Sequence, residues 1–334
     1  MLYPDFEELL QLGYRASNVN LMSRRKVQSI ASGDHRSPFR GKGLEFEEVR
    51  EYVAGDDVRN IDWRVTARTG SPHLKLFTEE RERSIIICTD VNLSMRFGTR
   101  GTFKSVQAAR AAALLGWAAS REHNRIGGSF YGNVPGGMMF VDPSRSRRAL
   151  WRILKQLCGR GEHYKEPVAL EEHLKYLTKA VPSGALVFII SDFLTPSKDL
   201  KKALSHLHRR ADVVLVSVND PADKLLPAIG AVEFCGDTGQ RLIVNTSDKK
   251  GHIAYEREWT RGRMELESIV ASLGLGFVQI KTNGDVYKEL IGGLKRVGRT
   301  AVNSRKGGSV HGAATAASHY PARHGRDAAA SLPA

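Results

Sequence analysis

The chain has 334 residues, of which 41% are hydrophobic and 26% charged, and its formal net charge is +14. This apolar content can build a sizeable core, so a wholly disordered chain is excluded, and the length favours one large domain with appendages or two domains. The positive charge makes an anionic partner conceivable, whether nucleic acid, an anionic lipid surface or an acidic protein.

Three widely spaced cysteines, Cys88, Cys158 and Cys235, form no C-x-x-C pair, which excludes a zinc ribbon. A sparse and odd number of cysteines fits free thiols in a reducing compartment. The longest apolar runs, such as residues 185–190, fall far short of the ~20 residues that cross a bilayer. The N-terminus lacks a basic-then-apolar signal pattern. These features predict a soluble cytoplasmic protein without a transmembrane segment.

Residues 1–82 are predicted to form an N-terminal helical and polar segment. Amphipathic spacing in residues 1–30 indicates one or two helices, and the basic, turn-rich residues 31–43 indicate a loop. We interpret residues 44–80 as a cover held on a sheet by Arg–carboxylate pairs over an aromatic footing, with a docking or catalytic surface as the alternative. The footing would be Phe46, Tyr52, Ile61 and Trp63, and the pairs would join Arg50, Arg59, Arg64 and Arg68 to Glu45, Asp56, Asp57 and Asp62.

From residue 83 to residue 297 strand patterns and helical patterns alternate. Continuous apolar runs indicate buried strands at residues 83–90, 184–193, 211–220 and 275–283. Shorter strand patterns lie at residues 125–132 and 136–143, which can pair as a hairpin, and at residues 231–236 and 241–246, which flank a turn. Helical patterns occupy residues 103–123, 144–159, 168–181, 197–210, 249–274 and 285–297.

This alternation predicts a three-layer α/β domain over residues 83–297, with a mostly parallel, Rossmann-like sheet covered by helices on both faces. Ligands of such sheets bind at the carboxyl ends of the strands. Asp90 ends the first apolar run and Asp192 ends a later one. Both carboxylates are therefore predicted to lie at this edge of the sheet.

Residues 298–334 are predicted to form a disordered basic tail. From about residue 299 the chain is rich in Gly, Ala, Ser, His and Arg and shows no apolar period. Residues 294–334 hold seven Lys or Arg against one acid, Asp327, so six of the net positive charges lie there. Basic helices and this tail leave nucleic-acid binding open as an alternative, although no recognition motif accompanies them.

Oxygen-bearing side chains follow the first predicted strand at alternate positions. Asp90, Asn92 and Ser94 form a D-x-N-x-S pattern, and Asp192 is the natural carboxylate from a second loop. Converging oxygens of this kind suit a hard divalent cation such as Mg²⁺. The alternative is that Asp90 caps the following turn while Asn92 and Ser94 bond to the local backbone.

These motifs resemble those of known families. A strand followed by D-x-[SN]-x-S-M, with a later strand that ends in Ser-Asp, is similar to the von Willebrand factor A fold, whose metal-ion-dependent adhesion site uses D-x-S-x-S, a Thr and a further Asp. Residues 41–82 resemble the signature of the domain of unknown function 58 family, bacterial proteins with a von Willebrand factor A-like domain. The similar elements are G-x-G-x-E-F (Gly41 to Phe46), R-x-Y-x-x-G-D-D-x-R-x-I-D-W (Arg50 to Trp63), Ala67-Arg68 and K-x-F-x-E-E (Lys75 to Glu80).

The resemblance implies a metal site and a partner. It implies that a divalent cation, Mg²⁺ or another, is held directly or through water by Asp90, Asn92, Ser94 and Asp192. An acidic side chain of a protein client would complete the shell. Asn92 stands at a Ser of the family pattern, and residues 159–174 offer no counterpart of the second-loop Thr, so a degenerate site is expected. Similar proteins are often encoded beside MoxR-type AAA+ ATPases, which implies such an ATPase as partner in a chaperone-like or protein-maturation role.

The leading functional hypothesis is therefore a non-enzymatic protein-interaction module. The alternatives are a metal-dependent hydrolase at the Asp90 and Asp192 cluster and an electrostatic nucleic-acid binder. Enzyme motifs are otherwise weak, because the sequence has no Walker A loop and no G-x-S-x-G elbow. Cys88 lies inside an apolar run and is expected to be an inert core thiol.

Overall fold

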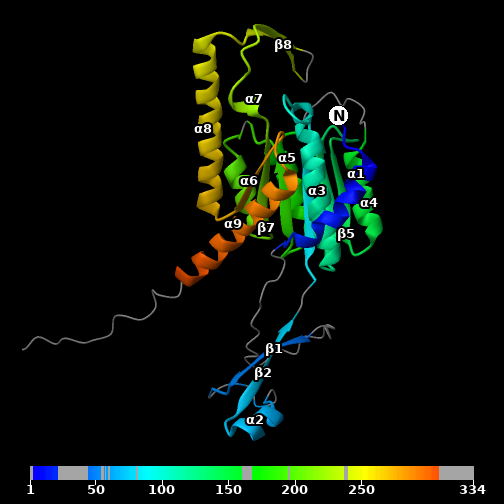
Figure 1. Ribbon diagram of the computed structural model, residues 1–334, viewed down its shortest axis with the longest axis vertical. Helices are drawn as coiled ribbons and strands as arrows, with labels where there is room; N and C mark the ends of the chain where they lie inside the picture. Colours follow the sequence, from blue (N-terminus) through cyan, green and yellow to red (C-terminus); the bar gives the residue numbers. More distant parts are fainter. Residues whose placement is uncertain are drawn as a thin grey trace, which may run out of the picture. The chain divides into compact units, whose positions relative to one another are not determined.

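The computed structural model describes residues 3–21, 44–53, 56, 58, 61–79, 82–159, 168–194, 196–236 and 240–307. The chain divides into two compact units, Met1–Val297 and Gly298–Ala334. The helices and strands described below belong to the first unit, and the last helix begins there. Figure 1 shows the helices and strands of the chain.

A six-stranded sheet in the order β10-β7-β6-β3-β4-β5 forms the centre of this unit. Its strands are β3 (Ser84–Val91), β4 (Arg125–Gly132), β5 (Met138–Ser144), β6 (Leu186–Ser191), β7 (Asp212–Asn219) and β10 (Gly276–Lys281). β5 runs antiparallel to β4 at one edge, and the other neighbours pair in parallel. The predicted mostly parallel α/β sheet is confirmed, with the hairpin and the four strands predicted from apolar runs. Three of these strands are buried along their length, whereas the edge strand β10 exposes Gln279 and Lys281.

Alternate residues of the parallel strands face two separate cores, because successive side chains of a strand point to opposite faces of the sheet. Ile85 and Ile87 of β3 lie in one buried cluster, whereas Ile86 and Cys88 lie in the other. Both faces are therefore dry, and this is why the strands read as unbroken apolar runs in the sequence.

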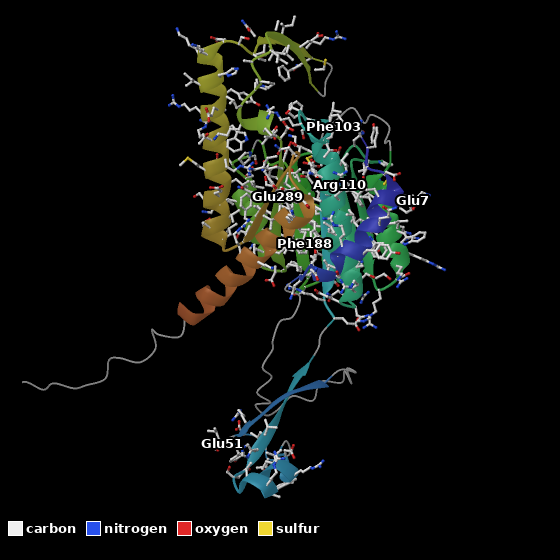
Figure 2. All side chains as sticks on the ribbon, in the orientation of Figure 1. Glu7, Glu51, Phe103, Arg110, Phe188 and Glu289 are labelled. Atoms are coloured by element: carbon white, nitrogen blue, oxygen red, sulfur yellow. The ribbon has the colours of Figure 1, made fainter. Side chains whose placement is uncertain are left out.

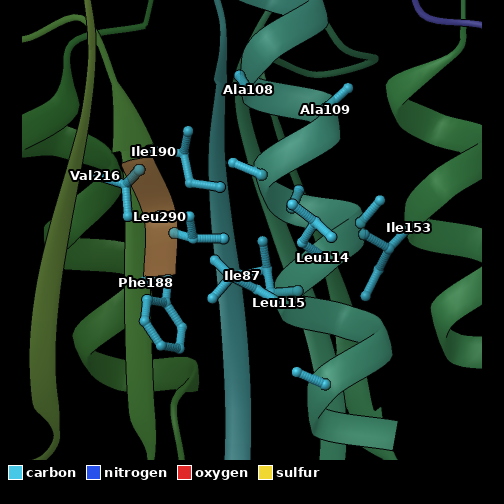
Figure 3. Close-up of a cluster of buried hydrophobic side chains, with 14 of the residues drawn as sticks. Ile87, Ala108, Ala109, Leu114, Leu115, Ile153, Phe188, Ile190, Val216 and Leu290 are labelled. Carbon is cyan, nitrogen blue, oxygen red and sulfur yellow. The ribbon is translucent and has the colours of Figure 1, made fainter. Parts of the chain in front are cut away.

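Helices cover both faces and make the predicted outer layers. The first face carries α1 (Phe6–Arg15), α3 (Lys104–Arg121), α4 (Arg147–Leu157) and α9 (Val286–Gly307). The second carries α5 (Leu170–Ala180), α6 (Leu200–His208) and α8 (Lys249–Leu273). Figure 3 shows the first core, where Leu114 and Leu115 of α3 lie beside Ile87 of β3. No helix in the described part of the chain has both the length and the apolar character needed to span a bilayer.

A short helix and a separate hairpin lie between β7 and β10. α7 (Pro221–Lys224) follows β7, and β8 (Ala231–Cys235) pairs antiparallel with β9 (Arg241–Asn245). α8 then runs for 25 residues and ends at Gly274, whose left-handed φ of 65° suits a residue without a Cβ. The two short strands and the helix end predicted here are confirmed.

The signature residues form a small structure of their own. β1 (Leu44–Glu51) pairs antiparallel with β2 (His73–Glu79), and α2 (Trp63–Thr69) lies between them in the sequence. Trp63 is 70% exposed, so the predicted aromatic footing is wrong at this residue. The reason is its place at the first position of a seven-residue helix with no buried residue.

One of the predicted ion pairs in the signature is present. Arg50 lies 2.7 Å from Asp56, and its hydrogen bond holds the pKa of the Asp56 carboxyl below its ordinary value. Asp62 instead caps α2 by accepting hydrogen bonds from backbone N–H groups of the first turn. Asp57 and Arg59 lie outside the described residues.

The first helix belongs to the main core, so the boundary predicted after residue 82 does not separate it from the sheet. Leu9 of α1 is fully buried in the first cluster, and Trp117 of α3 donates its indole N–H to the Leu9 carbonyl at 3.0 Å. Arg110 of α3 lies 2.5 Å from Glu8. Figure 2 shows α1 lying along α3, where Arg110 is labelled.

The last helix runs further than predicted. α9 continues past residue 297 to Gly307, so residues 298–307, predicted as the start of the tail, are helical instead. This stretch holds no proline, and its Ala, Arg and Lys residues favour a helix. Residues 308–334 lie outside the described residues, as do residues 22–43, where the predicted loop falls.

Candidate functional site

The two carboxylates predicted from the sequence lie at the carboxyl edge of the sheet. Asp90 is the second-last residue of β3, and Asp192 directly follows β6. β3 and β6 are parallel neighbours whose pairing reaches Thr89 and Ile190, so their ends meet. Both side chains are buried, with Asp90 6% and Asp192 5% exposed.

Each oxygen of the Asp90 carboxylate accepts two hydrogen bonds. Oδ1 accepts bonds from the backbone N–H and the side-chain amide of Asn92, both at 2.9 Å. Oδ2 accepts bonds from the hydroxyls of Tyr131 at 2.9 Å and Ser191 at 2.7 Å. Burial, with a further contribution from the charge of Asp192, nevertheless raises the pKa of Asp90 to about 6.

Asn92 and Ser94 do not take the positions predicted for metal ligands. Asn92 directs its amide nitrogen to Asp90 and to the Val168 carbonyl, 3.2 Å away. Gly132 makes room for this turn, because a Cβ there would come within 2.6 Å of the Asn92 nitrogen. Ser94 is exposed in the 3-10 turn Leu93–Arg96 and makes none of the bonds to Asp90.

A buried lysine joins Asp192 to a third carboxylate. Lys104 is the first residue of α3, directly after Phe103 in Figure 2, and is 1% exposed. Its ammonium lies 3.0 Å from Asp192 Oδ2 and 3.1 Å from Oδ1 of Asp223 in α7. Burial lowers the pKa of Lys104, but the two carboxylates outweigh it and raise that pKa above its ordinary value. The amine is therefore charged.

An arginine from the opposite helical layer reaches the same edge. Arg263 of α8 is 8% exposed and donates to the Ser217 hydroxyl at 2.8 Å and to the Asn219 side chain, both in β7. Burial lowers the pKa of Arg263, and nearby carboxylates, including Asp223 and Asp192, act in the opposite direction.

Asp220, at the end of β7, connects three loops. Its carboxylate accepts bonds from the hydroxyls of Thr99 at 2.5 Å and Thr282 at 2.6 Å, and from the Ala222 N–H that starts α7. Burial raises the pKa of Asp220, but the bonds from Thr282 and Thr99 outweigh it and hold that pKa below its ordinary value. The loops after β3, β7 and β10 are thereby fixed to one another.

The predicted ligands do not fit a divalent cation as they are arranged. Mg²⁺ needs free oxygen lone pairs in a near-octahedral shell. A carboxylate offers about four lone pairs, and four donors occupy those of Asp90; Lys104 also holds Asp192. In the part of the chain that the structure describes, no group of three or more His, Cys, Asp or Glu residues is placed to hold a metal. The metal site stays a prediction that these contacts do not support.

A serine–histidine pair inside the domain was not predicted. Ser129 of β4 lies 2.8 Å from Nε2 of His173 in α5, and both are fully buried. His173 stacks on Tyr131 with ring centres 4.9 Å apart, and burial lowers the pKa of His173 to about 4. A catalytic serine needs a base oriented by a third group, but Nδ1 of His173 finds no partner among the described residues. The pair is therefore a structural contact.

Sequence reasoning missed Lys104, although one signal was present. A lysine at the first position of a helix faces the positive end of the helix dipole and is locally unfavourable. Such a residue at the start of the first helix after a D-x-N-x-S turn points to carboxylates nearby. Cys88 follows its expectation, because it is fully buried and burial raises the pKa of its thiol. Residues 160–167, in the loop examined for a second-loop Thr, lie outside the described residues.

The sheet order, the antiparallel edge strand and the helices on both faces define a von Willebrand factor A-like α/β protein, here with a buried polar cluster at the strand ends. The chain belongs to the family described as "Protein of unknown function DUF58", which matches residues 48–265. The family recognised from the signature residues is thus confirmed.

Similar proteins of known sequence come from mycobacteria. "Uncharacterized protein Rv1480" of Mycobacterium tuberculosis (strain ATCC 25618 / H37Rv) and "Uncharacterized protein Mb1516" of Mycobacterium bovis (strain ATCC BAA-935 / AF2122/97) are each 31% identical over 277 residues, which is 82% of this chain and 86% of the relative.

Solved structures that align with the chain include two from different bacteria. The hypothetical protein BatB from Bacteroides thetaiotaomicron is 12% identical, with a TM-score of 0.38 over 65% of this chain and 99% of that one. A von Willebrand factor type A protein from Catenulispora acidiphila is 12% identical, with a TM-score of 0.36 over 67% of this chain and 43% of that one.

Proposed function

We propose that this chain is a non-enzymatic protein-interaction module that works with a MoxR-type AAA+ ATPase in a chaperone-like or protein-maturation role. The observation that carries the proposal is an arm at the carboxyl edge of the sheet. We call residues 231–262 the overhanging arm: it consists of β8, β9 and the first half of α8. The arm carries exposed apolar side chains, whereas the polar cluster at the strand ends is buried and therefore closed to small substrates.

The arm arises because α8 is longer than the sheet that it covers. Arg263 lies against the end of β7 through Ser217 and Asn219. At 1.5 Å per residue, residues 249–262 therefore extend about 20 Å beyond this edge. The buried residues of α8 all lie from Arg263 onward, so the first half has no core of its own. Figure 1 shows this half standing beside α7 and β8.

Specific contacts order the arm. Tyr255 of α8 donates its hydroxyl to the Ala222 carbonyl of α7 at 3.0 Å and so joins the arm to the domain. Thr246, after β9, donates its hydroxyl to the carbonyl of Gly230, just before β8, at 2.9 Å and so closes the base of the hairpin. A surface that is already ordered loses little conformational entropy when a partner binds, which favours affinity.

The exposed side chains of the arm indicate the chemistry of its partner. Three large apolar residues stand out: Leu242 is 63% exposed, Ile243 73% and Ile253 69%. Leu242 and Ile243 are consecutive in β9 and point to opposite faces of the hairpin, so both faces of the hairpin offer apolar surface of the kind that partners bind. The exposed positions of the arm carry charges of both signs, with Arg241, Lys249 and Lys250 beside Glu233, Asp248 and Glu258. A complementary partner has an apolar patch bordered by charges of both signs.

The direct test is binding to the purified MoxR-type AAA+ ATPase encoded in the same genome, measured by biolayer interferometry. Ile243→Glu and Ile253→Glu are expected to weaken binding at least tenfold, because each puts a charge into an apolar contact. Tyr14→Glu is the matched control, since Tyr14 of α1 is 88% exposed outside the arm. Wild-type affinity in both arm variants would contradict the proposal.

The absence of catalysis is part of the proposal. Asp90 and Asp192 are both buried and bonded to protein donors, which disfavours a hydrolase at this cluster. Turnover of generic phosphoesters with Mg²⁺ or Mn²⁺, lost in Asp90→Ala, would replace the interaction module with the hydrolase alternative. The nucleic-acid alternative rests on the basic helices together with the basic tail, most of which lies outside the described residues. Because the proposed partner uses ATP, we expect the interaction to take place in the cytoplasm.

A further inference from the structure

We propose that the ammonium of Lys104 is the resident cation of the strand-end cluster and takes the place of the divalent cation that the family resemblance implies. The proposal concerns how the buried carboxylates are neutralised, and it does not depend on which partner the arm binds. It means that the carboxyl edge of the sheet keeps its structure without a bound metal ion.

The ammonium is coordinated as a bound cation would be. It bridges carboxylates from two elements, Asp192 after β6 at 3.0 Å and Asp223 of α7 at 3.1 Å. Lysine is almost never buried so completely unless it is paired. Because Lys104 is 1% exposed, the carboxylate oxygens take the place of its water shell. The Phe97 ring, 5.4 Å from the nitrogen to the ring centre, adds a further favourable contact.

The remaining oxygens of these carboxylates are bonded as well. Asp192 Oδ1 accepts a bond from the Leu194 N–H at 3.3 Å. Asp223 Oδ2 accepts a bond from the Asp220 N–H at 2.7 Å. A divalent cation would displace these donors and would also stand beside an ammonium of like charge. The cluster is therefore built to exclude a metal ion.

The position of Lys104 in its helix supports the same conclusion. Lys104 starts α3, where the helix dipole opposes a cation, so its place is explained by the carboxylates and not by local helix chemistry. Four carboxylates are buried at this edge, those of Asp90, Asp192, Asp220 and Asp223. The ammonium pairs directly with Asp192 and Asp223, whereas Asp90 and Asp220 accept hydrogen bonds from hydroxyl groups.

The first experiment titrates the full chain with Mn²⁺ and follows bound metal by electron paramagnetic resonance. Wild type and Asp192→Asn are expected to give the same binding curve, because Asp192 holds an ammonium and not a metal. Mn²⁺ binding at least tenfold tighter in wild type than in Asp192→Asn would overturn the proposal. This comparison also separates the cluster from weak metal binding elsewhere on the chain.

The second experiment removes the resident cation. Lys104→Ala is expected to gain a Mn²⁺ site at least tenfold tighter than any in wild type, and Lys104→Ala/Asp192→Asn is expected to lose it. Lys201→Ala, which removes an exposed lysine of α6, is the matched control and should behave as wild type. Mn²⁺ binding in Lys104→Ala no tighter than in Lys201→Ala would overturn the proposal.

A third measurement needs no variant, in case Lys104→Ala does not fold. A ligand that binds only the folded state raises the melting temperature. The wild-type melting temperature is therefore expected to be the same in excess Mg²⁺ and in chelator, whereas a clear rise with Mg²⁺ would overturn the proposal. This outcome is distinct from the binding test of the arm, whose variants change residues that are not part of the cluster.

Discussion

Asp90 and His173 both contact Tyr131 and resist becoming charged. Asp90 accepts the Tyr131 hydroxyl, and His173 stacks on the Tyr131 ring. Burial raises the pKa of Asp90 to about 6 and lowers the pKa of His173 to about 4. Both shifts favour the neutral form, which is the expected result of removing an ionisable group from water. The two groups therefore affect stability in opposite senses as pH changes.

The sign follows from proton binding in the folded and unfolded states. Asp90 has a raised pKa in the folded state, so its contribution is full below the unfolded pKa and is lost as pH rises through about 6. His173 has a lowered pKa, so its contribution is full above the unfolded pKa and is lost as pH falls through about 4. Between these two values the contributions oppose each other in the wild-type protein.

Single variants should separate the two contributions. Relative to wild type, the free energy of unfolding of Asp90→Asn should increase with pH between about 4 and 6, by up to about 1.4 kcal/mol per pH unit. For His173→Phe, which keeps a ring against Tyr131, the same difference should decrease with pH. Urea unfolding at three pH values in this range measures both slopes. Slopes of the same sign in the two variants would contradict the assignment.

At this scale the sequence predicted the strand-end aspartates but not their partners. Asp90 and Asp192 were located because the sequence alone shows a carboxylate at the end of an apolar run. Lys104 was not, since its partners, Asp192 and Asp223, are 88 and 119 residues away along the chain. The predicted metal site used the same oxygens, but nothing in the local pattern indicated that an amine would occupy one of them.

The helix α9 packs closely on the strand β10, and a glycine permits this contact. A Cβ at Gly293 would lie 2.5 Å from a methyl carbon of Val278 in β10. At the preceding residue, Gly292, the nearest atom to such a Cβ is the flexible end of Arg296, at 3.7 Å. The two glycines are neighbours inside the same helix, so they share its backbone environment and differ only in how closely they pack against other residues.

This pair gives a matched prediction for helix packing. Gly293→Ala should destabilise the protein by about 1–3 kcal/mol because the added methyl group overpacks the contact with β10. Gly292→Ala should stabilise it by up to about 1 kcal/mol, because alanine loses less backbone entropy in a helix. Chemical denaturation of both variants tests the prediction. Equal effects of the two substitutions would show that α9 does not pack closely on β10.

Elements with a regular pattern were predicted and irregular ones were not. The strands of the main sheet, the two hairpins and the end of α8 at Gly274 all follow from apolar runs, short strand patterns and glycine signals. β1 and β2 were not predicted as strands because a bulge between Phe46 and Glu48 breaks the alternation. The overhang of α8 was also invisible, since the sequence gives the length of a helix but not where its neighbour ends.

The whole unit depends on a helix from the far N-terminus. Leu9 and Leu12 of α1 lie in the same buried cluster as the sheet, and Trp117 and Arg110 of α3 bond to α1. The amphipathic pattern predicted this helix but did not indicate which surface it would cover. The N-terminal segment predicted over residues 1–82 thus includes a helix that packs on the core of the sheet.

A substitution in α1 should accordingly affect the stability of the whole unit. Leu9→Ala should destabilise it by about 2–5 kcal/mol, because Leu9 is fully buried and its removal leaves a cavity under α3. Tyr14→Ala, in the same helix but 88% exposed, should change stability by less than about 0.5 kcal/mol. Thermal unfolding measures both. A small effect of Leu9→Ala would show that α1 is dispensable for the core.

The central claim is that the strand-end cluster of this von Willebrand factor A-like protein is neutralised from within, by Lys104, and leaves recognition to the overhanging arm. A crystal structure of the full chain grown with excess Mn²⁺, with anomalous data collected for the metal, tests it most directly. Density for the Lys104 amine is expected between Asp192 and Asp223, with no anomalous peak beside them. An anomalous peak bonded to Asp90 or Asp192 would contradict it.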